Sequence, residues 1–146
     1  MPTQAKAAPG ALLLTPKDHT LIMIDFQSQM AFATHSIDAV NLRTNAALVA
    51  QAAAGFKVST ILTTVAEKSF SGPMFSEIGE AFPGQAMLDR TSMNTWEDAA
   101  VIQEVNRIGA LRIDVQNLSI NHFSAIPLAG LMVGQGRRQR LANDLL

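Results

Sequence analysis

Two side chains that can carry out acid–base chemistry stand where predicted strands end. Asp25 follows the apolar run of residues 20–24, and Arg90 follows a shorter apolar segment at residues 86–88. In an open sheet of parallel strands, ligands bind at the edge where the strands end. We therefore expect a carboxylate and a guanidinium to meet there. The guanidinium favours the ionised carboxylate, and such a pair can position a substrate carbonyl or relay a proton.

Other ionisable side chains give weaker signals. Lys68 follows the predicted strand at residues 58–65 and would add a second cation to the same edge, or lie in a solvated loop. The three histidines are His19, His35 and His122. Their spacing matches no metal site, so we expect neither a metal nor a cofactor.

The sequence contains no cysteine. This excludes disulfides, thiolate metal sites and a cysteine nucleophile from these 146 residues. The hydrophobic share of 48% and the charged share of 16% indicate a globular chain, whose length fits a single domain over residues 1–146. A net charge of −1, with no basic stripe, predicts no nucleic-acid partner. Without a membrane-spanning run or a signal peptide, we expect a cytoplasmic protein.

Strands and helices alternate along the sequence. The uniformly apolar run at 20–24 is typical of a strand buried on both faces, and 58–65 is rich in β-branched residues. Between them, Asp38 can cap a helix that ends at Gly55, with Val40, Leu42, Leu48 and Val49 as apolar positions. This alternation predicts a parallel sheet wrapped by helices.

The second half of the sequence continues the pattern less clearly. A short helix is predicted at 74–82, and a longer one begins with Thr95 as cap and ends at Gly109. Residues 111–120 alternate apolar with polar, which is typical of a half-exposed strand. Residues 1–15 are expected to form an extended tail.

Three segments resemble the isochorismatase-like cysteine hydrolase superfamily, and within it the YcaC-like branch. They are residues 21–27, 60–64 and 88–98, and their order and spacing match over residues 12–109. The resemblance implies a three-layer α/β/α sandwich with a mainly parallel sheet. It also implies hydrolysis of amides or related C–N bonds, or of a vinyl ether as in isochorismatases proper.

The resemblance assigns catalytic roles to two residues, and the third catalytic residue of the family has no counterpart in this sequence. The family's triad is an Asp after the first strand, a Lys or Arg after the third, and a Cys at the start of a later helix. Asp25 and Arg90 match the first two. In the family the Asp activates the thiol, which attacks a carbonyl to form a thioester. Counting from Gly109, the Cys position falls near Phe123, which has no nucleophile. The nearby Ser119 and Ser124 lack a motif for a base or oxyanion donors.

The substrate pocket is predicted from the same comparison. The loops at residues 27–36 and 69–73 would line it, with Phe26, Gln27 and Trp96 contributing to its walls. Its ligand would be a small molecule.

The sequence departs from the family over residues 110–146 and ends before the family's last strands and helices. Three explanations remain: a degenerate paralogue, a frame-shifted or truncated product, or a divergent enzyme without a thiol. Three functions remain with them. The first is a hydrolase scaffold that has lost the cysteine-dependent reaction. The second is a non-catalytic binding or assembly subunit, since family members commonly form homo-oligomers. The third is a Cys-independent vinyl-ether hydrolase with Asp25 as general acid.

Overall fold

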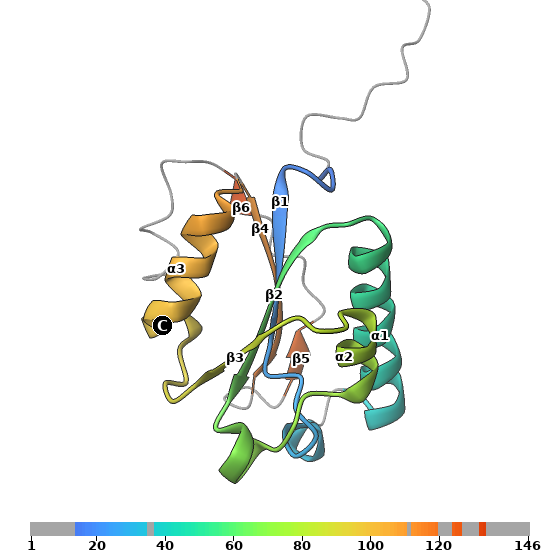
Figure 1. Cartoon of the computed structure of the whole chain (residues 1–146). Coiled ribbons are helices and arrows are strands. Elements are labelled where there is room, and N and C mark those ends of the chain that lie inside the picture. The colour runs from blue at the N-terminus through green and yellow to red at the C-terminus, as the bar shows by residue number, and fades with distance from the viewer. Residues whose placement is uncertain (1–13, 35–36, 111, 120–123, 127–131, 134–146) are drawn as a thin grey trace, which may run out of the picture.

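A sheet of parallel strands separates two layers of helices (Figure 1). The structure is a computed structural model that describes residues 14–34, 37–110, 112–119, 124–126 and 132–133. The four parallel strands have the spatial order β3-β2-β1-β4. They are β1 (His19–Ile24), β2 (Ser59–Val65), β3 (Met87–Arg90) and β4 (Arg112–Ser119). The short strands β5 (Ser124–Ile126) and β6 (Met132–Val133) both pair antiparallel with β4.

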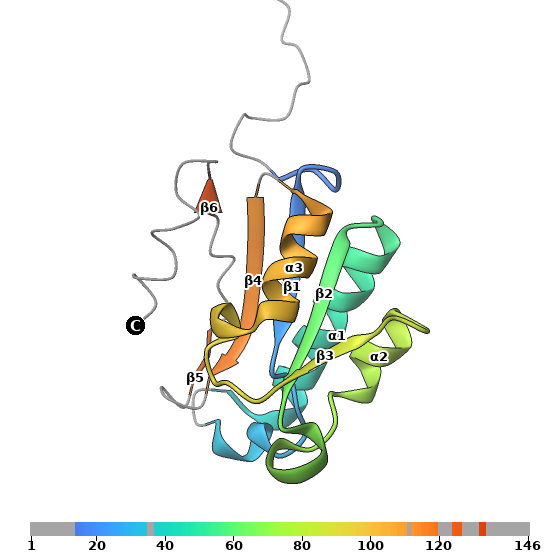
Figure 2. The same ribbon diagram turned by 60° about the vertical axis from the view of Figure 1, so that its left-hand side comes forward.

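The helices cover both faces of the sheet, as the resemblance implied. The helices α1 (Ala39–Gly55) and α2 (Ser76–Ala81) lie on one face, and α3 (Ala99–Ile108) lies on the other (Figures 1 and 2). Three short helical turns complete the described elements: η1 (Met30–Ala33), η2 (Glu67–Ser71) and η3 (Thr95–Glu97). The predicted three-layer α/β/α sandwich is therefore confirmed.

Side chains of β1 point alternately into two cores, which explains its uniformly apolar sequence. Leu21 and Met23 belong to the core on the α1 side, together with buried residues of α1 and α2. Ile22 and Ile24 belong to the core on the α3 side, which Val105 of α3 contacts. Because both faces of β1 are covered, the end of this strand is buried.

Helix α1 begins as predicted but packs differently. Asp38 caps it, because its Oδ1 accepts hydrogen bonds from the backbone N–H groups of Val40 (3.1 Å) and Asn41 (3.0 Å). Val40 and Leu48, two of the predicted apolar positions, are 74% and 64% exposed. The buried positions of the helix are Leu42, Ala46, Ala50 and Ala53. The prediction weighted large side chains, whereas small alanines allow the helix to approach the sheet closely.

The end of one predicted helix is confirmed and the start of another needs correction. Helix α1 ends at Gly55 as predicted, with Phe56 as its C-cap. Helix α3 begins after Asp98, whose Oδ1 accepts from the backbone N–H groups of the first turn. Thr95, the predicted cap, instead begins η3. Gly109 does end α3, in the left-handed conformation (φ 67°) that glycine adopts without strain.

The remaining predictions need smaller adjustments. The helix predicted at 74–82 spans only Ser76–Ala81, and the short third strand extends to Arg90. The half-exposed strand predicted at 111–120 is β4, and residues 112–116 are half-buried. The single domain, the tail at 1–15 and the divergent segment at 110–146 stay predictions. No helix among the described residues is long and apolar enough to cross a membrane.

Candidate active site

Asp25 lies at the first turn after β1 in an unusual backbone conformation. Its φ of 59° is in the left-handed region, which aspartate tolerates better than most residues. Its backbone N–H donates to the carbonyl of Thr63 on β2 (3.1 Å), and its carbonyl accepts from the N–H of Gln27 (2.7 Å). These bonds hold the turn against the neighbouring strand, and the residue is 5% exposed.

Arg90 is the last residue of β3, and it reaches Asp25 across β2. Its Nη2 forms a buried ion pair with Oδ1 of Asp25, which lies 65 positions away in the sequence. Its Nη1 donates to the carbonyls of Ser92 (2.9 Å) and Met93 (3.2 Å). The chain folding back after β3 therefore fixes the guanidinium. The predicted meeting of carboxylate and guanidinium at this edge is what the structure shows.

The electrostatics of the pair differ from the prediction. Burial is the largest influence on Asp25 and raises the pKa of its carboxyl. The hydrogen bond and charge of Arg90 act in the opposite direction but do not outweigh the loss of solvent, and Asp89 adds to the rise in pKa. Asp25 therefore keeps its proton to a higher pH than an ordinary aspartate. This property suits a proton donor.

Gln27, a predicted pocket residue, has its carboxamide engaged within the fold. The amide N–H groups donate to the carbonyls of Val65 (3.2 Å) and Gly72 (2.6 Å), and Oε1 accepts from the N–H of Val65 (2.9 Å). The side chain is fully buried. Gln27 therefore joins the ends of β1 and β2 to the loop after η2, next to Asp25.

The two aromatic residues predicted as pocket walls lie in different cores. Phe26 packs edge-on against Phe75, with ring centroids 6.1 Å apart, on the α1 side of the sheet. Trp96 is partly buried against the core on the α3 side. The structure does not bring these two side chains together. Lys68, the further predicted cation, is exposed on η2.

Sequence reasoning missed three polar residues beside this pair, namely Thr63, Thr64 and Asp89. Oδ1 of Asp89 accepts from Oγ1 of Thr64 (3.0 Å) and from the N–H of Glu67 (3.0 Å), which ties β3 to the turn after β2. Thr63 is fully buried, and its carbonyl holds Asp25. The available signal was two consecutive threonines near the end of β2, between the buried apolar residues Leu62 and Val65.

The position predicted for the missing nucleophile lies outside the described residues. Asn117 of β4 is the register partner of Ile24, so β4 passes beside the end of β1. Phe123 itself is not among the described residues, and its assignment stays a prediction. Among the described residues, no group of three His, Cys, Asp or Glu side chains could hold a metal ion. His35 and His122 are not described, and Nδ1 of His19 lies 2.6 Å from the carbonyl of Thr15.

Comparison with protein-family models and with curated proteins finds no match. Two solved structures are similar. One is YcaC from Escherichia coli, an octameric hydrolase of unknown specificity, with a TM-score of 0.66 and 24% identity over 75% of this chain. The other is YcaC from Pseudomonas aeruginosa, solved with hexane-2,5-diol and covalent acrylamide, with a TM-score of 0.67 and 23% identity over 75% of this chain.

The chain has the fold of YcaC, an isochorismatase-like hydrolase. This likeness confirms the fold that the sequence resemblance implied. The chain spans about half the length of each YcaC, covering 54% of one and 55% of the other.

Proposed function

We propose that this chain is an isochorismatase-like hydrolase scaffold that binds a small molecule at Asp25 and Arg90 and does not form a thioester. The observation that carries this proposal is the buried pair at the end of β1 and β3. The fold of YcaC supports the hydrolase class. Because the sequence contains no cysteine, no thiolate of these residues can attack a substrate carbonyl.

A panel of small amides and esters tests the proposal. We expect ligands to raise the melting temperature of the chain, and Asp25→Asn and Arg90→Lys to remove that rise. Asp18→Asn, at the opposite end of β1, is the matched control and keeps it. The original chain should release no more ammonia from the amides than the Asp25→Asn variant does. A covalent acyl adduct in the intact-mass spectrum, on Ser119 or Ser124 for example, would contradict the proposal.

A second candidate function is Cys-independent hydrolysis of a vinyl ether, and the raised pKa of Asp25 favours it. Asp25 would give its proton to the terminal vinyl carbon, and water would add to the resulting cation. The hemiketal then separates into a carbonyl product and an alcohol, and a proton returns to Asp25.

Isochorismate is the substrate that tests this alternative. We expect pyruvate release that Asp25→Asn abolishes, and activity that falls as the pH rises through the pKa of Asp25. Absence of pyruvate at high enzyme concentration rejects vinyl-ether hydrolysis while leaving the binding proposal intact.

Assembly as a homo-oligomer is the third candidate. The E. coli YcaC is octameric, and this chain exposes large apolar side chains. Phe32 on η1 is 88% exposed and Phe70 on η2 is 73% exposed. A backbone hydrogen bond from Gln29 to Ser71 (3.3 Å) joins the two segments that carry them.

Light scattering after size exclusion tests assembly. We expect an oligomer that Phe32→Ser weakens more than Phe56→Ser, a matched change at a residue 71% exposed at the end of α1. A well-behaved monomer contradicts the assembly proposal. The cytoplasmic location stays a sequence-based prediction.

A further inference from the structure

The last two residues of β3 bind three polar groups of the turn that follows β2. Oδ1 of Asp89 accepts hydrogen bonds from Oγ1 of Thr64 (3.0 Å) and from the backbone N–H of Glu67 (3.0 Å). The carbonyl of Arg90 accepts from the N–H of Ala66 (2.9 Å), which lies between these two donors in the sequence. The side chain of Asp89 and the backbone of Arg90 therefore hold the same turn against the end of β3.

This turn needs support because Ala66 is in the left-handed conformation, with φ 49° and ψ 46°. A Cβ atom makes that conformation unfavourable, and such residues persist only where the surrounding bonds determine them. The carbonyl of Ala66 also accepts from the N–H groups of Ser69 (3.1 Å), Phe70 (3.1 Å) and Ser71 (3.3 Å), which form η2. Loss of the bonds on either side of Ala66 would therefore let the turn relax.

Arg90 depends on the same bonds, because it ends a short strand at the edge of the sheet. Among the described residues β3 pairs only with β2, and Arg90 and Val65 are their last register partners. Ends of this kind open most easily in native proteins. The carbonyls of Ser92 and Met93 bind the guanidinium, but they belong to the segment that follows Arg90 and would move with it. The turn after β2 is what ties Arg90 to its neighbouring strand.

The charge of Asp89 has a second, separable effect. Arg90 is bonded to the carboxylate of Asp25 and directly follows Asp89 in the sequence. After burial, which is the largest influence, the negative charge of Asp89 also raises the pKa of Asp25, while Arg90 lowers it. An asparagine at position 89 could accept the same two hydrogen bonds without carrying the charge. The hydrogen bonds and the charge can therefore be tested apart.

We propose that Asp89 is a positioning residue of the candidate active site, which fixes the Arg90 guanidinium against Asp25 by holding the turn after β2. The inference rests on the proposed function, because it names a residue that acts on the Asp25–Arg90 pair of that site without touching a ligand. Its two contributions are the hydrogen bonds that place Arg90 and the charge that acts on Asp25.

Nuclear magnetic resonance of the full chain without ligand tests both contributions. The Nε–H signal of Arg90, assigned by its absence in Arg90→Lys, reports the position of the guanidinium. The carboxyl carbon signal of Asp25, assigned by its absence in Asp25→Asn, reports the pKa. Asp89→Leu removes the bonds and should shift the Arg90 signal. Asp89→Asn keeps the acceptor oxygen, so it should return the Arg90 signal to near its original position and lower the pKa of Asp25, because a like charge is lost.

Two further variants complete the design. Glu67→Gln is the matched control, because it removes a carboxylate from the same turn but keeps the backbone bond to Asp89. It should leave the Arg90 signal and the pKa of Asp25 unchanged. Thr64→Val removes one bond to Asp89 and keeps the charge. It should shift the Arg90 signal without lowering the pKa of Asp25, and it tests the hydrogen bonds even if Asp89→Leu does not fold.

Three results would overturn the proposal. They are an Arg90 signal that neither Asp89→Leu nor Thr64→Val moves, an Arg90 shift as large in Asp89→Asn as in Asp89→Leu, or a pKa of Asp25 that Glu67→Gln lowers as much as Asp89→Asn does. Because every measurement is made without ligand, a failure to bind amides or esters would contradict the proposed function and leave the positioning role of Asp89 standing.

Discussion

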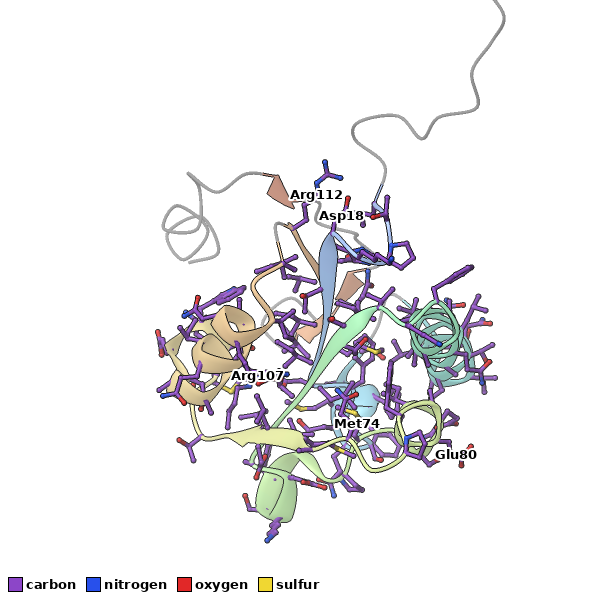
Figure 3. The ribbon with its side chains drawn as sticks, turned by 45° about the horizontal axis from the view of Figure 1, so that its top comes forward. Asp18, Met74, Glu80, Arg107 and Arg112 are labelled. Carbon is purple, nitrogen blue, oxygen red and sulfur yellow. The ribbon has the colours of Figure 1, made fainter. Side chains whose placement is uncertain are left out.

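An aspartate and an arginine form an ion pair at each end of β1. The two pairs differ in solvent exposure and in the direction in which the pKa of the aspartate is shifted. At the start, Oδ2 of Asp18 lies 3.7 Å from Nη1 of Arg112, and Figure 3 shows both residues there. Their side chains are 30% and 16% exposed, whereas those of Asp25 and Arg90 are 7% and 0% exposed. A backbone hydrogen bond from Thr15 is the main cause that lowers the pKa of Asp18, and burial raises the pKa of Asp25.

The difference shows that residue types do not determine what an ion pair does. At the start of β1, water and a backbone donor stabilise the charged carboxylate, so the pair only helps to hold β1 beside β4. At the end of β1, the carboxylate loses its water, so its charged form is less favoured despite the arginine. Only the second environment raises the pKa of the carboxyl above that of an ordinary aspartate.

The largest expected difference between the two pairs is in stability. Removing one partner of a buried pair leaves an uncompensated charge, so Arg90→Met should lower the free energy of unfolding by about 3–5 kcal/mol. Arg112→Met should have a much smaller effect, because its partner remains hydrated. Urea unfolding measures both. The double variant Asp25→Asn/Arg90→Met should recover part of the loss, and a loss below about 1 kcal/mol for Arg90→Met would contradict the buried-pair interpretation.

A second comparison concerns the glutamines that tie loops to each end of the sheet. Gln27→Leu removes three hydrogen bonds near Asp25 and leaves Val65 with an unpaired buried N–H. The expected loss is about 2–3 kcal/mol. Gln85→Leu removes one part-buried bond to Thr60, near the start of β2, and should cost no more than about 1 kcal/mol. Equal losses in urea unfolding would show that Gln27 does not secure the end of the sheet.

The meeting of Asp25 and Arg90 could be predicted from the sequence because it depends on topology. Parallel strands end at one edge, so a charged residue after each strand is brought there whatever the packing details. The sign of the pKa shift could not be predicted, since it depends on how completely side chains from distant segments exclude water.

The packing of the predicted pocket residues depends on distant segments in the same way. Phe26 and Trp96 were both predicted to be pocket walls, and the structure places them in cores on opposite sides of the sheet. Gln27 was predicted to contribute to the same pocket. Its partners at Val65 and Gly72 are 38 and 45 positions away, beyond any local signal.

Stability as a function of pH should separate the two aspartates by sign. The folded pKa of Asp25 is raised, so its contribution to stability is complete below its unfolded pKa of about 4 and is lost as the pH rises through the folded value. The pKa of Asp18 is lowered, so its contribution is present above its unfolded pKa and is lost as the pH falls through the folded value.

Urea unfolding of Asp25→Asn and Asp18→Asn between about pH 3 and 7 measures these contributions. The advantage of the original chain over Asp25→Asn should shrink with rising pH, and its advantage over Asp18→Asn should grow. Slopes of the same sign would show that burial does not dominate at Asp25.

The smallest expected effect concerns a feature found near both ends of the sheet. It is a buried threonine hydroxyl without a hydrogen-bond partner among the described residues. Thr63→Val and Thr20→Val replace that hydroxyl by a methyl group of similar shape. Each should leave the free energy of unfolding unchanged or raise it by up to about 1 kcal/mol without ligand, because no hydrogen bond is lost. If Thr63→Val alone destabilises the ligand-free chain, its hydroxyl already has a bound partner such as an internal water, and the two ends of the sheet differ in hydration as well as in charge.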